Sequence, residues 1–207
     1  MAPRRGNHSY LESVFINCPF SPDYAHILRA YVFAVMDCGL RPRCARETDN
    51  AAEIRVEKII KLLSGCRLSI HDLSYTGLDP DSGLARFNMP FELGLALAVD
   101  RLQAKKPERQ FVVFETSAHA AKKCLSDISG QDCRSHGLLP GVIVSETRDW
   151  LRTAHGRPLP GPDIMLDRHS RFESDFPDLC QQFGQRPTSL VFVDLCEMIR
   201  NWIAENG

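Results

Sequence analysis

The chain has 207 residues, of which 43% are hydrophobic and 25% charged, and this ordinary globular composition excludes a disordered chain, a collagen and a coiled coil. Lysine and arginine together number 25 against 26 acidic residues, so no global basic field attracts a nucleic acid backbone. No apolar stretch approaches the roughly 18 residues of a membrane helix, and no apolar region of a secretory leader follows residues 1–9. We therefore expect a cytoplasmic protein that binds neither nucleic acid nor a membrane.

The eight cysteines form no CxxC pair and no Cys/His cluster with zinc spacing. Scattered cysteines of this kind stay unpaired in a reducing compartment. We expect free thiols, no disulfide framework and no metal site.

Strand and helix patterns alternate in the first part of the chain. The apolar run at residues 14–18 ends in a turn sequence and predicts a buried strand. Apolar residues then recur at helical spacing over residues 24–36, which predicts a helix that crosses back over the sheet. Residues 40–45 form a weaker strand pattern, in which Pro42 favours an edge position. Residues 54–63 are typical of a second helix.

The alternation continues to residue 114. Residues 67–73 (RLSIHDL) and 111–114 (FVVF) predict two more strands, and residues 90–102 form a helix that is apolar on nearly every side. Gly94 and Ala98 should let this helix lie close to the sheet. Because strands that alternate with helices pair in parallel, we expect an α/β, flavodoxin-like three-layer sandwich. Its central parallel sheet should have the order 2-1-3-4, with a possible fifth strand.

The character of the sequence changes near residue 131. Three helical patterns follow one another, at residues 142–154, 164–183 and 190–203. We therefore divide the chain into an αβ domain at residues 1–130 and an all-helical extension at residues 131–207. The apolar faces around Trp150 and Trp202 must be covered by the αβ core or by another subunit. The polar run at residues 131–137 is either a connector or an active-site loop.

The strongest local signal joins IHDLS at residues 70–74 to NMPFELGLALA at residues 88–98. It places Asp72 at the carboxyl end of a strand and Glu92 in the first turn of the next helix, beside the crevice of such a sheet. Free amides and the helix dipole favour an ionised Glu92. A fixed anion there suits a cationic transition state, such as the oxocarbenium-like ribose of N-glycosidic cleavage. The alternative is that Glu92 only satisfies amides of its own first turn.

The run from Asp72-Leu73-Ser74 through Asn88 to residues 92–98 resembles the signature shared by nucleoside 2-deoxyribosyltransferases and bacterial TIR-like nucleotide-binding domains. Residues 14–20, with Asp23 after them, resemble the opening strand and loop of TIR domains. The resemblance covers roughly residues 14–116 and implies a flavodoxin-like fold. It also implies that Glu92 is the catalytic glutamate in cleavage of NAD or a nucleoside.

This family resemblance further implies a role in bacterial immunity and activation by self-assembly, so we expect a homo-oligomer. Two parts of the chain depart from the family pattern. The 13 residues 75–87 form a long insertion, and the extension from residue 131 has no counterpart.

The other candidate residues lie in the same crevice. The resemblance places Asp72 at a ribose or base contact, whereas a turn acid satisfied by loop amides is the alternative. Ser21 is either a phosphate contact or a simple helix cap, and Arg86 either binds a pyrophosphate or is a solvated surface residue. His71 is expected to be a hydrogen-bonded core residue. The expected site comprises Glu92 as the catalytic residue and, for substrate binding, Asn17, Cys18, Phe20, Ser21, Asp23, Asp72, Ser74, Arg86 and Asn88.

The sequence thus predicts a hydrolase or transferase that needs no cofactor and takes NAD or a related nucleotide as its substrate. The alternative is a non-catalytic nucleotide-binding sensor, or an assembly module, that uses the same crevice.

Overall fold

A parallel sheet of five strands forms the centre of the molecule in the computed structural model, which describes residues 10–78, 83–102, 109–128, 130–187 and 190–207. The strand order is β2-β1-β3-β4-β5, and every neighbouring pair is parallel. The strands are β1 (Ser13–Asn17), β2 (Arg41–Arg43), β3 (Leu68–Asp72), β4 (Gln110–Glu115) and β5 (Cys133–Ser135). The predicted flavodoxin-like α/β sandwich is confirmed, with β1 beside β3 and β2 at an edge.

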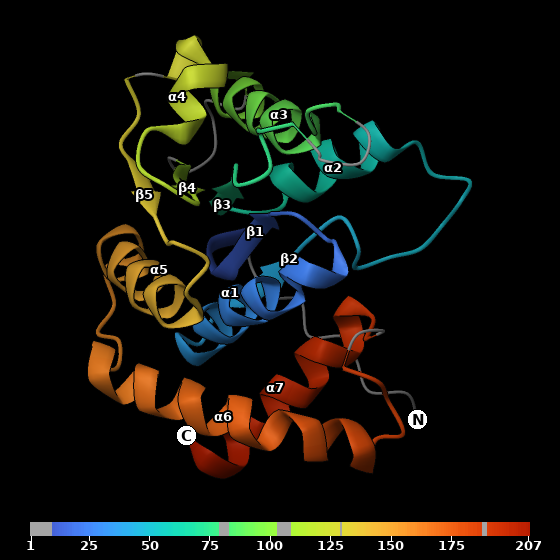
Figure 1. Cartoon of the computed structure of the whole chain (residues 1–207), viewed down its shortest axis with the longest axis vertical. Helices are drawn as coiled ribbons and strands as arrows, with labels where there is room; N and C mark the ends of the chain where they lie inside the picture. The colour runs from blue at the N-terminus through green and yellow to red at the C-terminus, as the bar shows by residue number, and fades with distance from the viewer. Residues whose placement is uncertain (1–9, 79–82, 103–108, 129, 188–189) are drawn as a thin grey trace.

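Helices cover both faces of this sheet (Figure 1). They are α1 (Ala25–Asp37), α2 (Arg55–Ser64), α3 (Asn88–Leu102), α4 (Ala120–Cys124), α5 (Pro140–His155), α6 (Pro162–Gln182) and α7 (Phe192–Asn206). Short 3-10 turns stand at Tyr10–Glu12, Pro22–Tyr24 and Ser126–Ile128. Figure 1 shows α2, α3 and α4 on one side of the sheet, α1 and α5 on the other, and α6 and α7 as a further layer outside α1.

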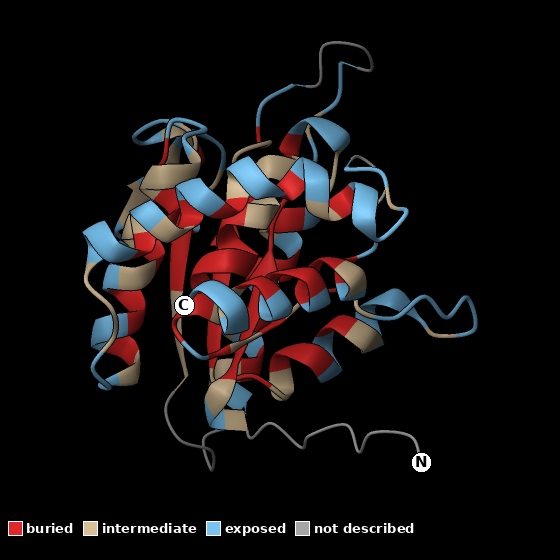
Figure 2. Ribbon diagram, turned by 90° about the horizontal axis from the view of Figure 1, so that it is seen from below, coloured by how far each residue is buried: buried red, intermediate tan, exposed pale blue. Residues whose placement is uncertain are grey.

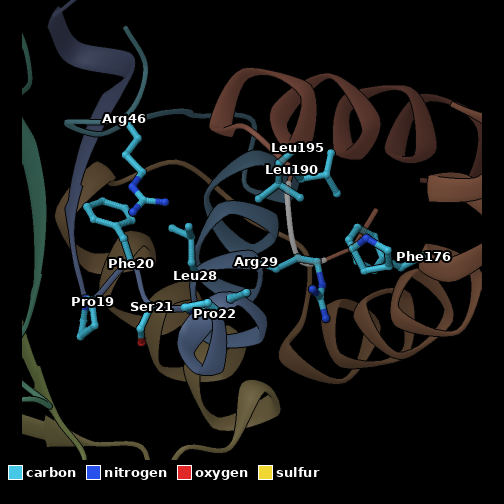
Figure 3. Close-up of a pocket in the computed structure, with 12 residues that line it drawn as sticks. Pro19, Phe20, Ser21, Pro22, Leu28, Arg29, Arg46, Phe176, Leu190 and Leu195 are labelled. Carbon is cyan, nitrogen blue, oxygen red and sulfur yellow. The ribbon is translucent and has the colours of Figure 1, made fainter. Parts of the chain in front are cut away.

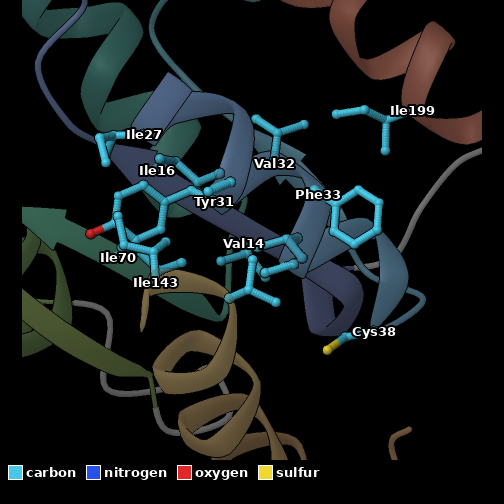
Figure 4. Packing of buried hydrophobic residues seen from close by; sticks show 14 of the residues in the cluster. Val14, Ile16, Ile27, Tyr31, Val32, Phe33, Cys38, Ile70, Ile143 and Ile199 are labelled. Carbon is cyan, nitrogen blue, oxygen red and sulfur yellow. The ribbon is translucent and has the colours of Figure 1, made fainter. Parts of the chain in front are cut away.

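The two-residue period of a strand assigns the core residues to the two faces of the sheet. Val14 and Ile16 of β1 pack with α1 and α5, whereas Phe15 between them packs with α2 and α3. All three side chains are fully buried. Figure 4 shows Val14 and Ile16 beside Tyr31 of α1 and Ile143 of α5. The buried strand predicted at residues 14–18 is confirmed, and Ile70, Val112 and Val113 of the next two strands are buried as well.

The C-terminal helices cover α1 within the same chain. Phe33 of α1 stacks on Phe172 of α6 and lies near Trp202 of α7. Trp150 and Trp202 are only 7% and 3% exposed. Figure 2 shows the buried residues gathered in the interior and the exposed ones along the outer helix faces and loops. The predicted all-helical extension is wrong at its start, because β5 pairs with β4 there and adds the fifth strand.

Helix α3 packs against the sheet through a different face from the one predicted. Its buried residues are Met89, Glu92, Leu93, Ala96 and Val99. Gly94 and Ala98 lie on the solvent side, where a Cβ on Gly94 would meet no atom within 4 Å. The expectation that they allow close packing is therefore wrong. Leu95 and Leu97, on the flanks of the packed face, are half-buried. Among the described residues, no helix combines the length and apolar character needed to cross a membrane.

Candidate functional site

A cavity of about 460 Å³ opens at the carboxyl end of β1, between the loop that follows this strand and the start of α3. It lies at the edge of the sheet where the predicted strand order places a crevice. The described residues that line it are Asn17, Cys18, Pro19, Phe20, Ser21, Arg46, Arg55, Arg86, Asn88, Met89 and Glu92. We call this cavity the β1–α3 pocket. Of the predicted site residues, only Asp23, Asp72 and Ser74 are missing from its lining.

Glu92 is a buried acid in the wall of this pocket, with 3% of its surface exposed. Oε1 lies 3.4 Å from Nη2 of Arg55, and Oε2 has no hydrogen-bond partner among the described residues. Helix α3 begins at Asn88, so Glu92 stands beyond the first turn. Burial raises the pKa of the Glu92 carboxyl, an effect that Arg55 only partly opposes. Glu92 therefore does not satisfy the amides of its own first turn, and that alternative is wrong. Its ionisation at neutral pH stays a prediction.

Asn17 ties the end of β1 to the start of α3. Its Nδ2 donates hydrogen bonds to the Met89 carbonyl oxygen at 2.9 Å and to Nδ1 of His71 at 3.2 Å. Burial, aided by the charge of Arg109, lowers the pKa of His71 to about 3, so the ring is neutral and Nδ1 accepts. Nε2 of His71 then donates to Ser69 Oγ at 3.0 Å. Because both hydrogens of its Nδ2 are used, Asn17 can offer a ligand only its carbonyl oxygen.

Three arginines from different elements surround the pocket. Arg46 follows β2 and lies over the ring of Phe20, with its guanidinium carbon 4.8 Å from the centroid. Arg55 begins α2, and Arg86 precedes α3 and lies 5.4 Å from the Tyr75 ring centroid. Sequence reasoning identified Arg86 but missed Arg46 and Arg55. Arg46 could have been predicted from the strand order β2-β1-β3, because this order places the loop after β2 beside the loop after β1.

Asp72 lies outside the pocket, at the centre of a buried hydrogen-bond network. Its carboxylate accepts hydrogen bonds from the hydroxyls of Tyr24 and Tyr31, the latter at 2.9 Å, and from the amide of Ser74 at 3.0 Å. The Ser74 hydroxyl also donates to it, and Nε2 of His136 lies 3.3 Å away. Burial favours the protonated acid, but the hydrogen bond and charge of His136, with the hydrogen bonds from Ser74 and Tyr24, outweigh burial and hold the pKa of Asp72 below its ordinary value. This network joins the ends of β3 and β5 to α1.

The remaining predicted residues have simple placements. Ser21 lines the pocket but does not cap the turn after it, and its buried hydroxyl has no hydrogen-bond partner among the described residues. The cap interpretation of Ser21 is therefore wrong. Asp23 is exposed in the Pro22–Tyr24 turn. Burial raises the pKa of the Cys18 thiol well above its ordinary value, with the charge of Asp72 adding to the effect, so this cysteine is a wall residue and not a nucleophile.

The arrangement of charge determines which ligands the pocket suits. Guanidinium groups at its rim bind phosphates, and a buried carboxylate can stabilise a positive charge that develops beside it. No group of three or more His, Cys, Asp or Glu side chains within the described part of the chain could hold a metal ion. Comparisons of the chain with protein-family models, with curated proteins and with solved structures found no match.

Proposed function

We propose that this protein binds NAD or a related nucleotide in the β1–α3 pocket and cleaves its N-glycosidic bond, with Glu92 as the catalytic residue. The observation that carries the proposal is the Glu92 carboxylate, whose buried Oε2 is without a partner among the described residues. The arginines Arg46, Arg55 and Arg86 support it, since they line the same cavity and can bind the phosphates of a nucleotide.

The chemistry follows from the charge that this bond cleavage creates. As the bond from ribose to base breaks, its electron pair leaves with the base and positive charge develops on the ribose ring. The Glu92 carboxylate either stabilises this charge or attacks the ribose carbon to form an ester, which water or another acceptor then cleaves. The ionised acid is the active form, so turnover should rise with pH through the raised pKa of Glu92.

A non-catalytic nucleotide sensor is the second candidate, and one contact favours it. Oε1 of Glu92 lies beside the Arg55 guanidinium, so the carboxylate has a resident counter-ion that a substrate would have to share. In this alternative the arginines bind a nucleotide and Glu92 only holds Arg55 in place. The roles in bacterial immunity and self-assembly remain extensions of the proposal and rest on the family resemblance.

Replacement of Glu92 by Gln tests the catalytic role. The amide keeps the shape of the side chain but removes its charge, so turnover of NAD should fall by about 100-fold or more while binding persists. Mass spectrometry of the products from NAD and from separate nucleosides measures turnover, and calorimetry measures binding. Asp100→Asn removes an acid from the same helix outside the pocket and should leave both unchanged. A variant E92Q that retains wild-type turnover would refute the catalytic role.

The free energy of unfolding of Glu92→Gln shows whether Glu92 has a catalytic or a structural role. Because burial raises the pKa of Glu92, the ionised carboxylate opposes folding at neutral pH, and its contribution becomes unfavourable as pH rises above the ordinary pKa. Glu92→Gln should therefore increase the free energy of unfolding at pH 7, and this gain should vanish at acid pH. Urea unfolding at both pH values measures the change. A loss of stability at pH 7 would indicate a structural carboxylate.

A further inference from the structure

A second cavity adjoins the β1–α3 pocket. It measures about 220 Å³ and lies between the start of α1, the end of α6 and the start of α7 (Figure 3). Most of the described residues that line it are apolar, among them Phe20, Leu28, Phe176, Leu190 and Leu195, while Ser21, Arg29 and Arg46 add polar surface. We call it the apolar lobe.

The apolar lobe and the β1–α3 pocket share one wall, formed by Pro19, Phe20, Ser21 and Arg46. Figure 3 shows the Arg46 guanidinium over the Phe20 ring, on the side of the lobe that faces β1. A ligand that reaches past these two side chains therefore contacts both cavities.

The two arginines of the apolar lobe differ in whether an acidic side chain compensates their positive charge. Arg29 makes a bidentate ion pair with Glu173, at 2.6 and 2.5 Å, and lies 4.1 Å from the centroid of the Phe176 ring. Its charge is therefore compensated within the protein. Arg46 is exposed and has no acidic partner among the described residues, so its charge is available to an anion at the boundary between the cavities.

We propose that the two cavities form one binding site, and that its ligand is a nucleotide with two arms joined through phosphate. This inference rests on the proposed function. One arm places its ribose at Glu92, the joining phosphate lies at Arg46, and the second arm places a flat or apolar group in the lobe between α1, α6 and α7. Burial of that group among Leu28, Phe176 and Leu190 supplies affinity that a one-armed nucleotide lacks.

Filling the apolar lobe tests this two-armed site. Leu28→Trp adds bulk from α1 and Leu190→Trp adds it from the segment before α7, and neither residue lines the β1–α3 pocket. The probes are NAD, which has two arms, and nicotinamide mononucleotide, which has one. Each variant should weaken the binding of NAD by about tenfold or more and leave the mononucleotide unchanged in calorimetry. Leu179→Trp, in a half-buried position of α6 outside both cavities, is the control and should alter neither affinity.

The outcomes separate the two proposals. Equal effects of L28W and L190W on both probes, in variants whose thermal unfolding matches the control, would overturn the two-armed site. Wild-type protein that binds and cleaves the mononucleotide as well as NAD would also overturn it, yet would leave the proposed function standing. Wild-type protein that binds neither probe would overturn both. Loss of NAD binding alone in either variant supports the inference, even where the other variant does not fold.

Discussion

At the residue scale, the wall of the pocket depends on a neutral histidine. Nδ1 of His71 accepts a hydrogen bond from Asn17, which also binds the Met89 carbonyl oxygen at the start of α3. A proton on Nδ1 would remove that acceptor and place a charge among fully buried neighbours. The geometry around Glu92 is thus linked to the protonation of a residue outside the pocket.

This link predicts a pH dependence of stability. The pKa of His71 is about 3 in the folded protein against an ordinary 6.5, so only the unfolded chain takes up this proton as the pH falls below 6.5. The free energy of unfolding should therefore decrease from pH 6.5 toward pH 3. His71→Gln should reduce that slope by about one proton, or roughly 1.4 kcal/mol per pH unit.

Urea unfolding between pH 6.5 and 4.5 measures this slope. His119→Gln, which replaces an exposed histidine, is the matched control. An identical slope in H71Q and wild-type protein would show that His71 takes up its proton in the folded state.

Local sequence could identify some site residues and not others. Glu92 and Asn88 belong to one continuous motif, and Arg86 directly precedes it. Asp72 also belongs to that motif, yet Tyr24 of the turn before α1 and Tyr31 of α1 reach it and fill its hydrogen-bonding capacity. No pattern around Asp72 reveals contacts that come from more than 40 positions away, with separations of 48 and 41 residues.

At the scale of elements, β3 is the central strand of the sheet. It pairs with β1 on one side and with β4 on the other, and Ile70 stands opposite Ile16 and Val112 in these two pairings. All three side chains are at most 5% exposed. Ile70 therefore lies at the centre of the buried cluster on the face of the sheet that packs against α1.

Truncation of the Ile70 side chain should clearly lower the stability of the protein. Ile70→Ala leaves a cavity with neighbours on every side, so the free energy of unfolding should fall by about 2–5 kcal/mol. Ile60→Ala, on α2, removes the same atoms from a 37% exposed side chain and should cost much less. Denaturant unfolding checks both. A loss below about 1 kcal/mol for I70A would show that the strand can repack.

Two features of the fold could not be predicted from the sequence: the presence of β5 and the face through which α3 packs. Strand β5 has three residues, Cys-Arg-Ser, that carry no strand pattern, and it exists because β4 offers it an unpaired edge. Helix α3 has apolar residues on both faces, with Phe91 53% exposed while Leu93 is buried. Periodicity alone could not select the packed face of such a helix.

At the scale of the whole molecule, the C-terminal part is a structural cover for the αβ sheet. Ile143 of α5 and Ile199 of α7 belong to the same core cluster as Val32 of α1. Figure 4 shows Val32 and Phe33 on the side of α1 toward Ile199. Without the chain after Gly130, these α1 side chains would face water.

Truncation after Gly130 should therefore give an insoluble or self-associating product. A second truncation after Gly156 keeps β5 and α5, and should retain more of the helical circular dichroism while still exposing Phe33. Size-exclusion chromatography with light scattering measures both products. A stable monomer of residues 1–130 would contradict the prediction.

The edges of the sheet limit how copies of this protein can associate. The two outermost strands, β2 and β5, have three residues each, and β2 holds Pro42 at its centre. Proline has no amide hydrogen to donate, and so short an edge offers few groups to a neighbouring chain. Extension of the sheet from one copy into the next is therefore disfavoured, as is fibril growth by strand addition. Self-assembly of this chain would have to proceed through its helices and loops.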